Sequence, residues 1–148
     1  METQKDFSDL LALFAEYKVD YLIVGAYALA YHGAPRYTGD LDLFVRPDSE
    51  NAERILCALN AFGFNAVGLV ASDFSQSDNV VQLGVAPVRI DIITSLTGLS
   101  WDEAVAGEVS GMYGELPVYY IGKNEFILNK RAIGRKKDIA DIEAIGEA

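Results

Sequence analysis

The chain has 148 residues, of which 51% are apolar and 23% are charged. This length and composition are typical of one soluble globular domain, so we expect a single domain over residues 1–148. Lys and Arg number 12 against 22 Asp and Glu, and the resulting net charge of −10 argues against an extensive nucleic-acid-binding surface. No apolar run reaches transmembrane length and the start is polar, so we expect neither a membrane partner nor a signal peptide.

The chain has one cysteine, Cys57, so a disulfide framework is not expected. Because Cys57 lies within a helical pattern, we expect its side chain to be buried as a small apolar group. A reducing cytoplasm is consistent with these features.

Periodicity and turn residues divide the chain into short helices and strands. Apolar residues at helical spacing predict helices at residues 6–18, 26–31, 49–62, 101–106, 124–133 and 136–145. Apolar and alternating runs predict strands at residues 21–24, 40–45, 80–85, 88–93, 108–113 and 116–120. The segment 65–79 is ambiguous, and part of it is typical of a surface loop or a single helical turn. This order predicts an α/β fold in the broad sense (α+β), with a mixed, partly antiparallel sheet flanked by helices.

Acidic residues interrupt two of the predicted strands. Asp40 and Asp42 lie in the run 40–45, where alternation places both carboxylates on one face, about 7 Å apart. Strands disfavour Asp, so two of them in one strand need a reason. Asp91 has similar apolar neighbours in the run 88–93, and if the two strands are adjacent the three carboxylates converge. Their mutual repulsion favours a bound cation, and oxygen ligands favour Mg²⁺ or Mn²⁺ over zinc.

A candidate phosphate site precedes the acids. The buried strand at residues 21–24 ends at Gly25 and Ala26, and a helix follows. Backbone N–H groups and the dipole at a helix N-terminus favour an anion, and a glycine allows close approach of a phosphate. A phosphate site beside metal-binding acids predicts phosphoryl or nucleotidyl transfer.

Taken together, Gly25-Ala26, Asp40-Leu41-Asp42 and Asp91 resemble the signature of the polymerase-β-type nucleotidyltransferase superfamily. The segments 32–42 and 129–141 are similar to those of small bacterial and archaeal nucleotidyltransferases related to abortive-infection and toxin–antitoxin proteins. The resemblance spans roughly residues 20 to 145. One departure is Ala26, which stands where the family has Ser or Gly and offers a backbone N–H but no hydroxyl.

The resemblance implies a nucleotidyltransferase core and Mg²⁺-dependent (or Mn²⁺-dependent) transfer of a nucleoside monophosphate from an NTP. The acceptor would be a tRNA or a protein hydroxyl, the role would be toxin-like, and a cognate antitoxin would be a partner. Asp40 and Asp42 would hold metal ions, and Asp91 would hold the catalytic one and help to deprotonate the acceptor. The residues expected to bind the nucleotide are Gly25, Ala26, Arg36, Thr38, Lys130, Arg135 and Lys137.

Several alternatives remain open at this point. The acids could be solvent-facing residues of half-exposed strands, and Arg36 and Thr38 could be ordinary polar loop residues. Haloacid-dehalogenase-type phosphatases also pair aspartates on a strand, but Leu43-Phe44 does not match their pattern. Metal-dependent glycosyltransferases carry Asp-x-Asp too, usually in longer chains. A different class is an inactive nucleotide-binding or partner-binding module on the same fold, which Ala26 favours.

Arg135, Lys136 and Lys137 oppose the dipole of the predicted last helix, which points to an anionic ligand or to compensation by Asp138 and Asp141.

Overall fold

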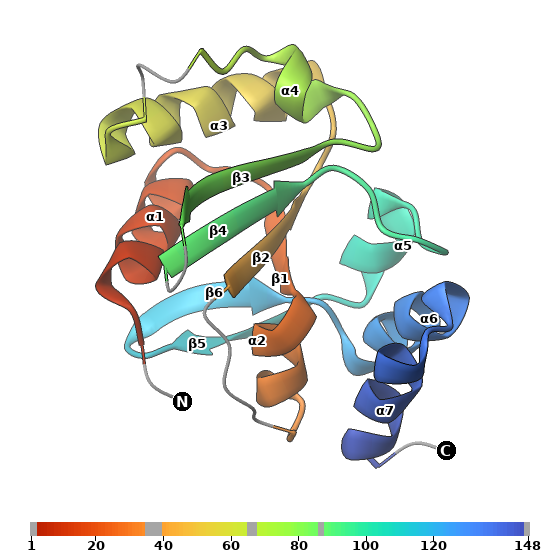
Figure 1. Cartoon of the computed structure of the whole chain (residues 1–148). Coiled ribbons are helices and arrows are strands. Elements are labelled where there is room, and N and C mark those ends of the chain that lie inside the picture. Colours follow the sequence, from red (N-terminus) through yellow and green to blue (C-terminus); the bar gives the residue numbers. More distant parts are fainter. Residues whose placement is uncertain (1–2, 35–39, 65–67, 86–87, 147–148) are drawn as a thin grey trace.

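The computed structural model describes residues 3–34, 40–64, 68–85 and 88–146. Six strands form one mixed sheet in the order β3-β4-β2-β1-β6-β5, flanked by helices (Figure 1). The strands are β1 (Tyr21–Val24), β2 (Asp40–Val45), β3 (Val80–Val85), β4 (Val88–Ile93), β5 (Val109–Tyr113) and β6 (Leu116–Tyr120). The pairs β1–β2, β3–β4 and β5–β6 are antiparallel, whereas β2–β4 and β1–β6 are parallel. The predicted mixed, partly antiparallel sheet is confirmed.

Seven helical segments are described: α1 (Lys5–Glu16), α2 (Gly25–Tyr31), α3 (Ser49–Phe62), α4 (Ser72–Ser75), α5 (Trp101–Ala106), α6 (Lys123–Ile133) and α7 (Lys136–Ala144). Local chemistry explains several of their ends. The Asp48 side chain accepts the N–H of Asn51 at the start of α3, and Ser100 forms a capping box with Glu103 at the start of α5. Glycines in the left-handed conformation follow α3 and α6. The predicted helices and strands are therefore present, with small differences at their ends.

The two faces of the sheet have different roles. Residues paired across strands share a face, and Tyr21 pairs with Val45 while Ile23 pairs with Leu43. The Tyr21 ring contacts Phe14 of α1, so α1 covers this face, where Leu41, Leu43 and Val45 are buried. On the opposite face of β2 lie Asp40, Asp42 and Phe44, and the Phe44 ring contacts Trp101 of α5.

One expectation about the core is wrong. Cys57 is exposed. The buried residues of α3 include Ile55, Ala58 and Leu59, and at about 100° per residue Cys57 lies far around the helix from Ile55. Within the described ranges, no helix combines the length and apolarity needed to cross a bilayer.

Candidate active site

The acids of β2 and β4 lie side by side. In the parallel register Asp42 is paired with Asp91, and Asp40 is paired with Arg89. Since residues paired in this way project from the same face, the Asp42 and Asp91 carboxyl groups are neighbours. Asp91 is only 8% exposed. The convergence of the acids was expected on the condition that their strands are adjacent, and β2 and β4 are adjacent.

The electrostatics of this acid pair are unfavourable for two negative charges. Burial, together with the charges of Asp91 and Asp40 and a hydrogen bond with Asp91, raises the pKa of Asp42 to about 6. The buried Oδ1 atom of Asp91 makes no hydrogen bond within the described part of the chain. A buried carboxylate oxygen without a partner is costly, so this corner of the sheet favours a proton or a cation.

Arg89 supplies one positive charge to these acids. Its Nη2 atom lies 2.8 Å from Asp40 Oδ2 and 3.2 Å from Asp91 Oδ2. Arg89 was not among the site residues predicted from the sequence. The signal was its spacing, because residues two apart on a strand share a face and Arg89 is two residues before Asp91.

The donor set of the site fits a hard divalent cation. Carboxylate oxygens are the ligands that Mg²⁺ and Mn²⁺ prefer, and Asp91 Oδ1 is available. However, no group of three or more His, Cys, Asp or Glu side chains in the described ranges is arranged to hold a metal ion. The expected convergence of Asp40, Asp42 and Asp91 is thus only partly met: Asp42 and Asp91 are paired, and the Asp40 and Asp91 carboxylates both contact Arg89.

Gly25 is closely packed against the acids. Its φ is +66°, a left-handed conformation, and a Cβ built there would lie 2.2 Å from Asp42 Oδ2. Both the backbone and the space therefore require glycine. Ala26 follows in the first turn of α2, so the strand–glycine–helix arrangement expected from the sequence lies directly beside Asp42. At the other end of α2, His32 follows the helix and its Nε2 lies 2.7 Å from the Ile121 carbonyl, to which it can donate.

The expected nucleotide-binding residues are not all brought together. Arg36 and Thr38 lie outside the described residues. Lys130 Nζ lies 3.4 Å from both Asp138 Oδ1 and Asp141 Oδ2, between α6 and α7. Lys137 is exposed on α7.

Arg135 is also paired within the α6–α7 hairpin. Its Nε lies 2.7 Å from Asp138 Oδ2, and its backbone N–H donates to the same carboxylate. Asp138 is fully buried, and the hydrogen bond from Arg135 is the main reason that its pKa is lowered to about 2. Compensation by Asp138 thus resolves much of the conflict between the cations and the dipole of α7.

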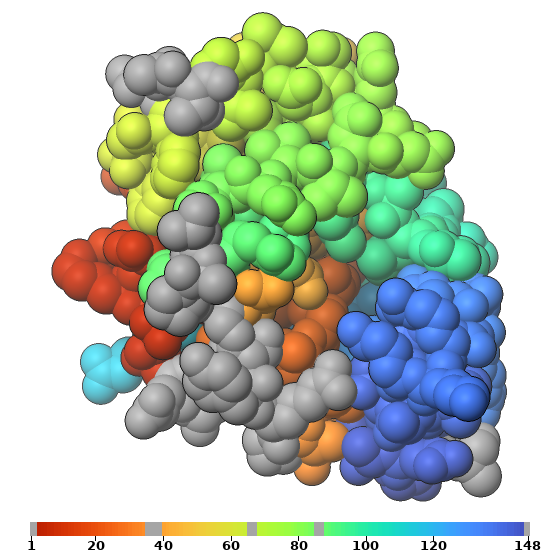
Figure 2. Space-filling model, viewed as in Figure 1, coloured from red at the N-terminus to blue at the C-terminus, as the bar shows by residue number. Residues whose placement is uncertain are grey.

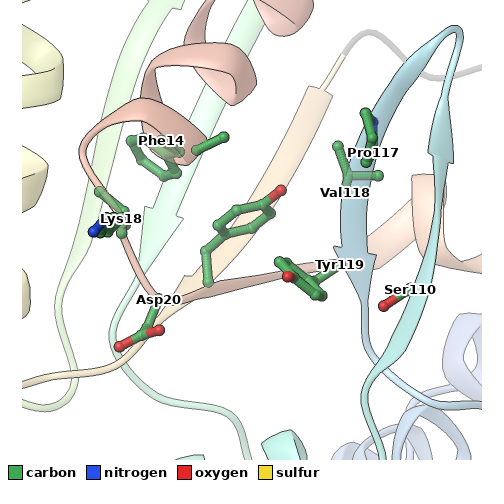
Figure 3. Close-up of a pocket in the computed structure, with 10 residues that line it drawn as sticks. Phe14, Lys18, Asp20, Ser110, Pro117, Val118 and Tyr119 are labelled. Carbon is green, nitrogen blue, oxygen red and sulfur yellow. The ribbon is translucent and has the colours of Figure 1, made fainter.

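A groove of about 410 Å³ lies beside the start of β1, at the opposite end of this strand from Gly25. Figure 3 shows Phe14 and Lys18 on one side, and Pro117, Val118 and Tyr119 of β6 on the other. Tyr21, which begins β1, contributes to its lining, and burial raises the pKa of Tyr21. This groove is therefore separate from the acids.

Comparisons with known proteins agree with this architecture. A nucleotidyltransferase assigned in Thermotoga maritima superposes with a TM-score of 0.63 at 13% identity, over 93% of this chain and 88% of that one. The antibiotic-resistance factor ANT(2'')-Ia gives a TM-score of 0.61 at 14% identity, over 95% of this chain and 80% of that one. The chain has the nucleotidyltransferase fold. The lincosamide antibiotic adenylyltransferase LnuA, solved with lincomycin bound, shares this nucleotidyltransferase fold with a TM-score of 0.57 at 15% identity, over 97% of this chain and 96% of that one.

Sequence comparisons add nothing to this: neither a protein-family model nor a curated protein matches the chain. The nucleotidyltransferase fold therefore rests on the arrangement of helices and strands, at identities that say nothing of the substrate.

Proposed function

We propose that the protein is a metal-dependent nucleotidyltransferase, which transfers a nucleoside monophosphate from an NTP to an acceptor hydroxyl. The observation that carries this proposal is the juxtaposition of Asp42 with the buried, incompletely bonded Asp91 on parallel strands, with Gly25 packed against Asp42. Perturbed acids of this kind mark candidate sites of catalysis, and this corner of the fold also offers backbone N–H groups at the start of α2.

The chemistry follows from the residues. Asp40, Asp42 and Asp91 would hold Mg²⁺ or Mn²⁺, which would neutralise phosphate charge and favour ionisation of the acceptor hydroxyl. Asp91 would accept the proton of that hydroxyl, whose oxygen forms a bond to the α-phosphorus. The bond from the α-phosphorus to the bridging oxygen breaks, and pyrophosphate leaves with the electron pair.

The phosphates would bind near Gly25 and Ala26, where a side chain larger than glycine at the first position would displace Asp42. Arg36 and Thr38 are proposed to contribute from the preceding loop. Lys137 has an exposed charge that can meet an anion, and Lys130 and Arg135 would first have to loosen their pairs with Asp138 and Asp141.

The acceptor is proposed to be a hydroxyl on tRNA, on a protein or on a small molecule. The first two follow from the resemblance to toxin-related nucleotidyltransferases, which would also imply a cognate antitoxin. The third follows from two fold neighbours: LnuA is a lincosamide antibiotic adenylyltransferase, and ANT(2'')-Ia is an antibiotic-resistance factor. With the net charge of −10, an RNA acceptor would have to enter by a local contact and not along a broad basic surface.

The second candidate function is an inactive nucleotide-binding or partner-binding module. Two observations favour it: Ala26 lacks a hydroxyl for the phosphates, and Arg89 bridges two of the three acids. The clustering of three acids around a single arginine disfavours it, because one positive charge leaves part of their mutual repulsion uncompensated unless a further cation binds.

Incubation with each NTP, labelled in turn at the α- and γ-phosphate, separates these functions. The samples would contain Mg²⁺ and either cellular RNA, cellular protein or a small-molecule extract. The enzyme would move the α-label, and not the γ-label, onto one acceptor fraction. If no α-label is transferred from any NTP to any fraction, the enzyme is refuted in favour of the inactive binding module.

A further inference from the structure

Arg89 of β4 lies among the acids of β2 and β4. A single nitrogen, Nη2, contacts both Asp40 on the neighbouring strand and Asp91 on its own strand. The Arg89 side chain is 35% exposed, so it can move toward solvent. Its charge offsets part of the repulsion among the acids.

The pairing is incompletely satisfied on both sides. Arg89 Nε and Asp91 Oδ1 are buried, and neither makes a hydrogen bond within the described part of the chain. A buried ion pair that serves only stability is usually saturated with hydrogen bonds, because each atom left without one costs free energy. The arrangement is therefore one that a better-coordinating cation can displace.

We propose that Arg89 is an internal counter-ion of the acids, and that a divalent metal binds by exchange with its guanidinium group. The guanidinium releases Asp40 and Asp91 when the metal takes their oxygens, so Arg89 sets the metal affinity of the site. This inference rests on the proposed function, because it presumes that the acids bind metal. It explains why the acids are not already arranged as a group of three.

The test is Mn²⁺ binding to the purified full chain without nucleotide, measured by calorimetry at neutral pH. Arg89→Met keeps an apolar stem but removes the charge, and it should tighten Mn²⁺ binding at least about tenfold. Each charge-assisted hydrogen bond that the metal no longer has to replace corresponds to about one decade of affinity or more. Arg89→Lys keeps the charge, so we expect affinity close to that of the unaltered protein.

Arg46→Met is the matched control. Arg46 directly follows β2 at the end opposite to Asp40, its side chain is 32% exposed, and it also bridges two acids, Asp20 and Asp48. Its loss changes the net charge equally, but screening should limit the effect on Mn²⁺ affinity to less than about threefold. Melting each variant in EDTA and in Mn²⁺ shows whether it is folded, and Mn²⁺ should stabilise Arg89→Met most.

The proposal is overturned if Arg89→Met binds Mn²⁺ as the unaltered protein does, more weakly, or not at all. It is also overturned if Arg46→Met has the same effect as Arg89→Met, because the change is then one of net charge. Label transfer by the unaltered protein reports separately on the proposed function. If the unaltered protein transfers label but Arg89→Met does not change Mn²⁺ affinity, only the proposed exchange of Arg89 for metal is refuted. If Arg89→Met binds Mn²⁺ more tightly but the unaltered protein transfers no label, only the proposed enzyme activity is refuted.

Discussion

Replacement of Asp42 by Asn should stabilise the metal-free protein at neutral pH. Asp42 is paired with Asp91 in the register of β2 and β4, and burial and the neighbouring acids raise its pKa from the ordinary value of 3.8 to about 6. Asn has nearly the same shape as protonated Asp and can donate to Asp91. The variant therefore keeps the hydrogen bond and loses the repulsive charge.

The magnitude follows from this difference in pKa. A pKa that is about two units higher in the folded protein corresponds to at most about 3 kcal/mol in the free energy of unfolding. Because Asp42 is partly exposed to solvent, we expect about 1–2 kcal/mol. Because the pKa of Asp42 is higher in the folded than in the unfolded protein, its contribution to stability is fully present below about pH 4. That contribution is lost as the pH rises through about 6. The gain from Asp42→Asn should therefore be complete above about pH 6 and vanish near pH 4.

Urea unfolding in EDTA at several pH values measures this gain. We expect a rise of about 1–2 kcal/mol in the free energy of unfolding at neutral pH, or a few degrees in melting temperature for a chain of this size. Asp102→Asn, at an exposed acid of α5, is the control and should bring no such gain. Equal free energies of unfolding for Asp42→Asn and the unaltered protein would refute this reasoning. So would a difference between them that stays constant from pH 4 to pH 7.

Two further predictions concern close packing and the C-terminal hairpin. Gly25→Ala should lower the free energy of unfolding by about 1–2 kcal/mol, because the φ of Gly25 is +66°, and it should also abolish metal and nucleotide binding by displacing Asp42. Gly68 has a φ of +76° but open space around it, so Gly68→Ala should lower stability without affecting binding. Equal binding by both variants in calorimetric titrations would contradict this. Asp138→Asn should lower the free energy of unfolding in urea by about 2 kcal/mol, since it removes the charge that pairs with Arg135 and Lys130 and leaves Asp141 as the buried partner of Lys130. Its effect should shrink as the pH falls from about 4 to 2, because the pKa of Asp138 is lowered to about 2, and an effect that does not depend on pH would exclude the ion pair as its cause.

Much of the fold is predictable from local patterns. Buried strands such as β1 are short apolar runs bounded by turn residues, and α5 begins at a Ser–Glu capping box that is visible in the sequence. The sequence alone did not decide whether β2 and β4 are adjacent, because strand order depends on packing between segments far apart in the chain. The exposed position of Cys57 was missed since a helical period alone does not say which face meets the core.

The acids proposed for the site could be picked out from the sequence, whereas their contacts could not. Acids within apolar strands predict Asp40, Asp42 and Asp91 because strands disfavour Asp. The bridge through Arg89 required the register that places it opposite Asp40. The pairing of Arg135 with Asp138 required the geometry of the first turn of α7; from the sequence, an anionic ligand was the favoured prediction and pairing with Asp138 or Asp141 the alternative.

The most direct test of the central claim compares Asp91→Asn with the unaltered protein in two assays on the same preparation. One measures NTP affinity, and the other measures transfer of the α-phosphate label to the acceptor fraction. If Asp91 accepts the proton and helps to hold the metal, transfer should fall at least about a hundredfold while NTP binding remains measurable. Transfer by Asp91→Asn at the rate of the unaltered protein would contradict the account.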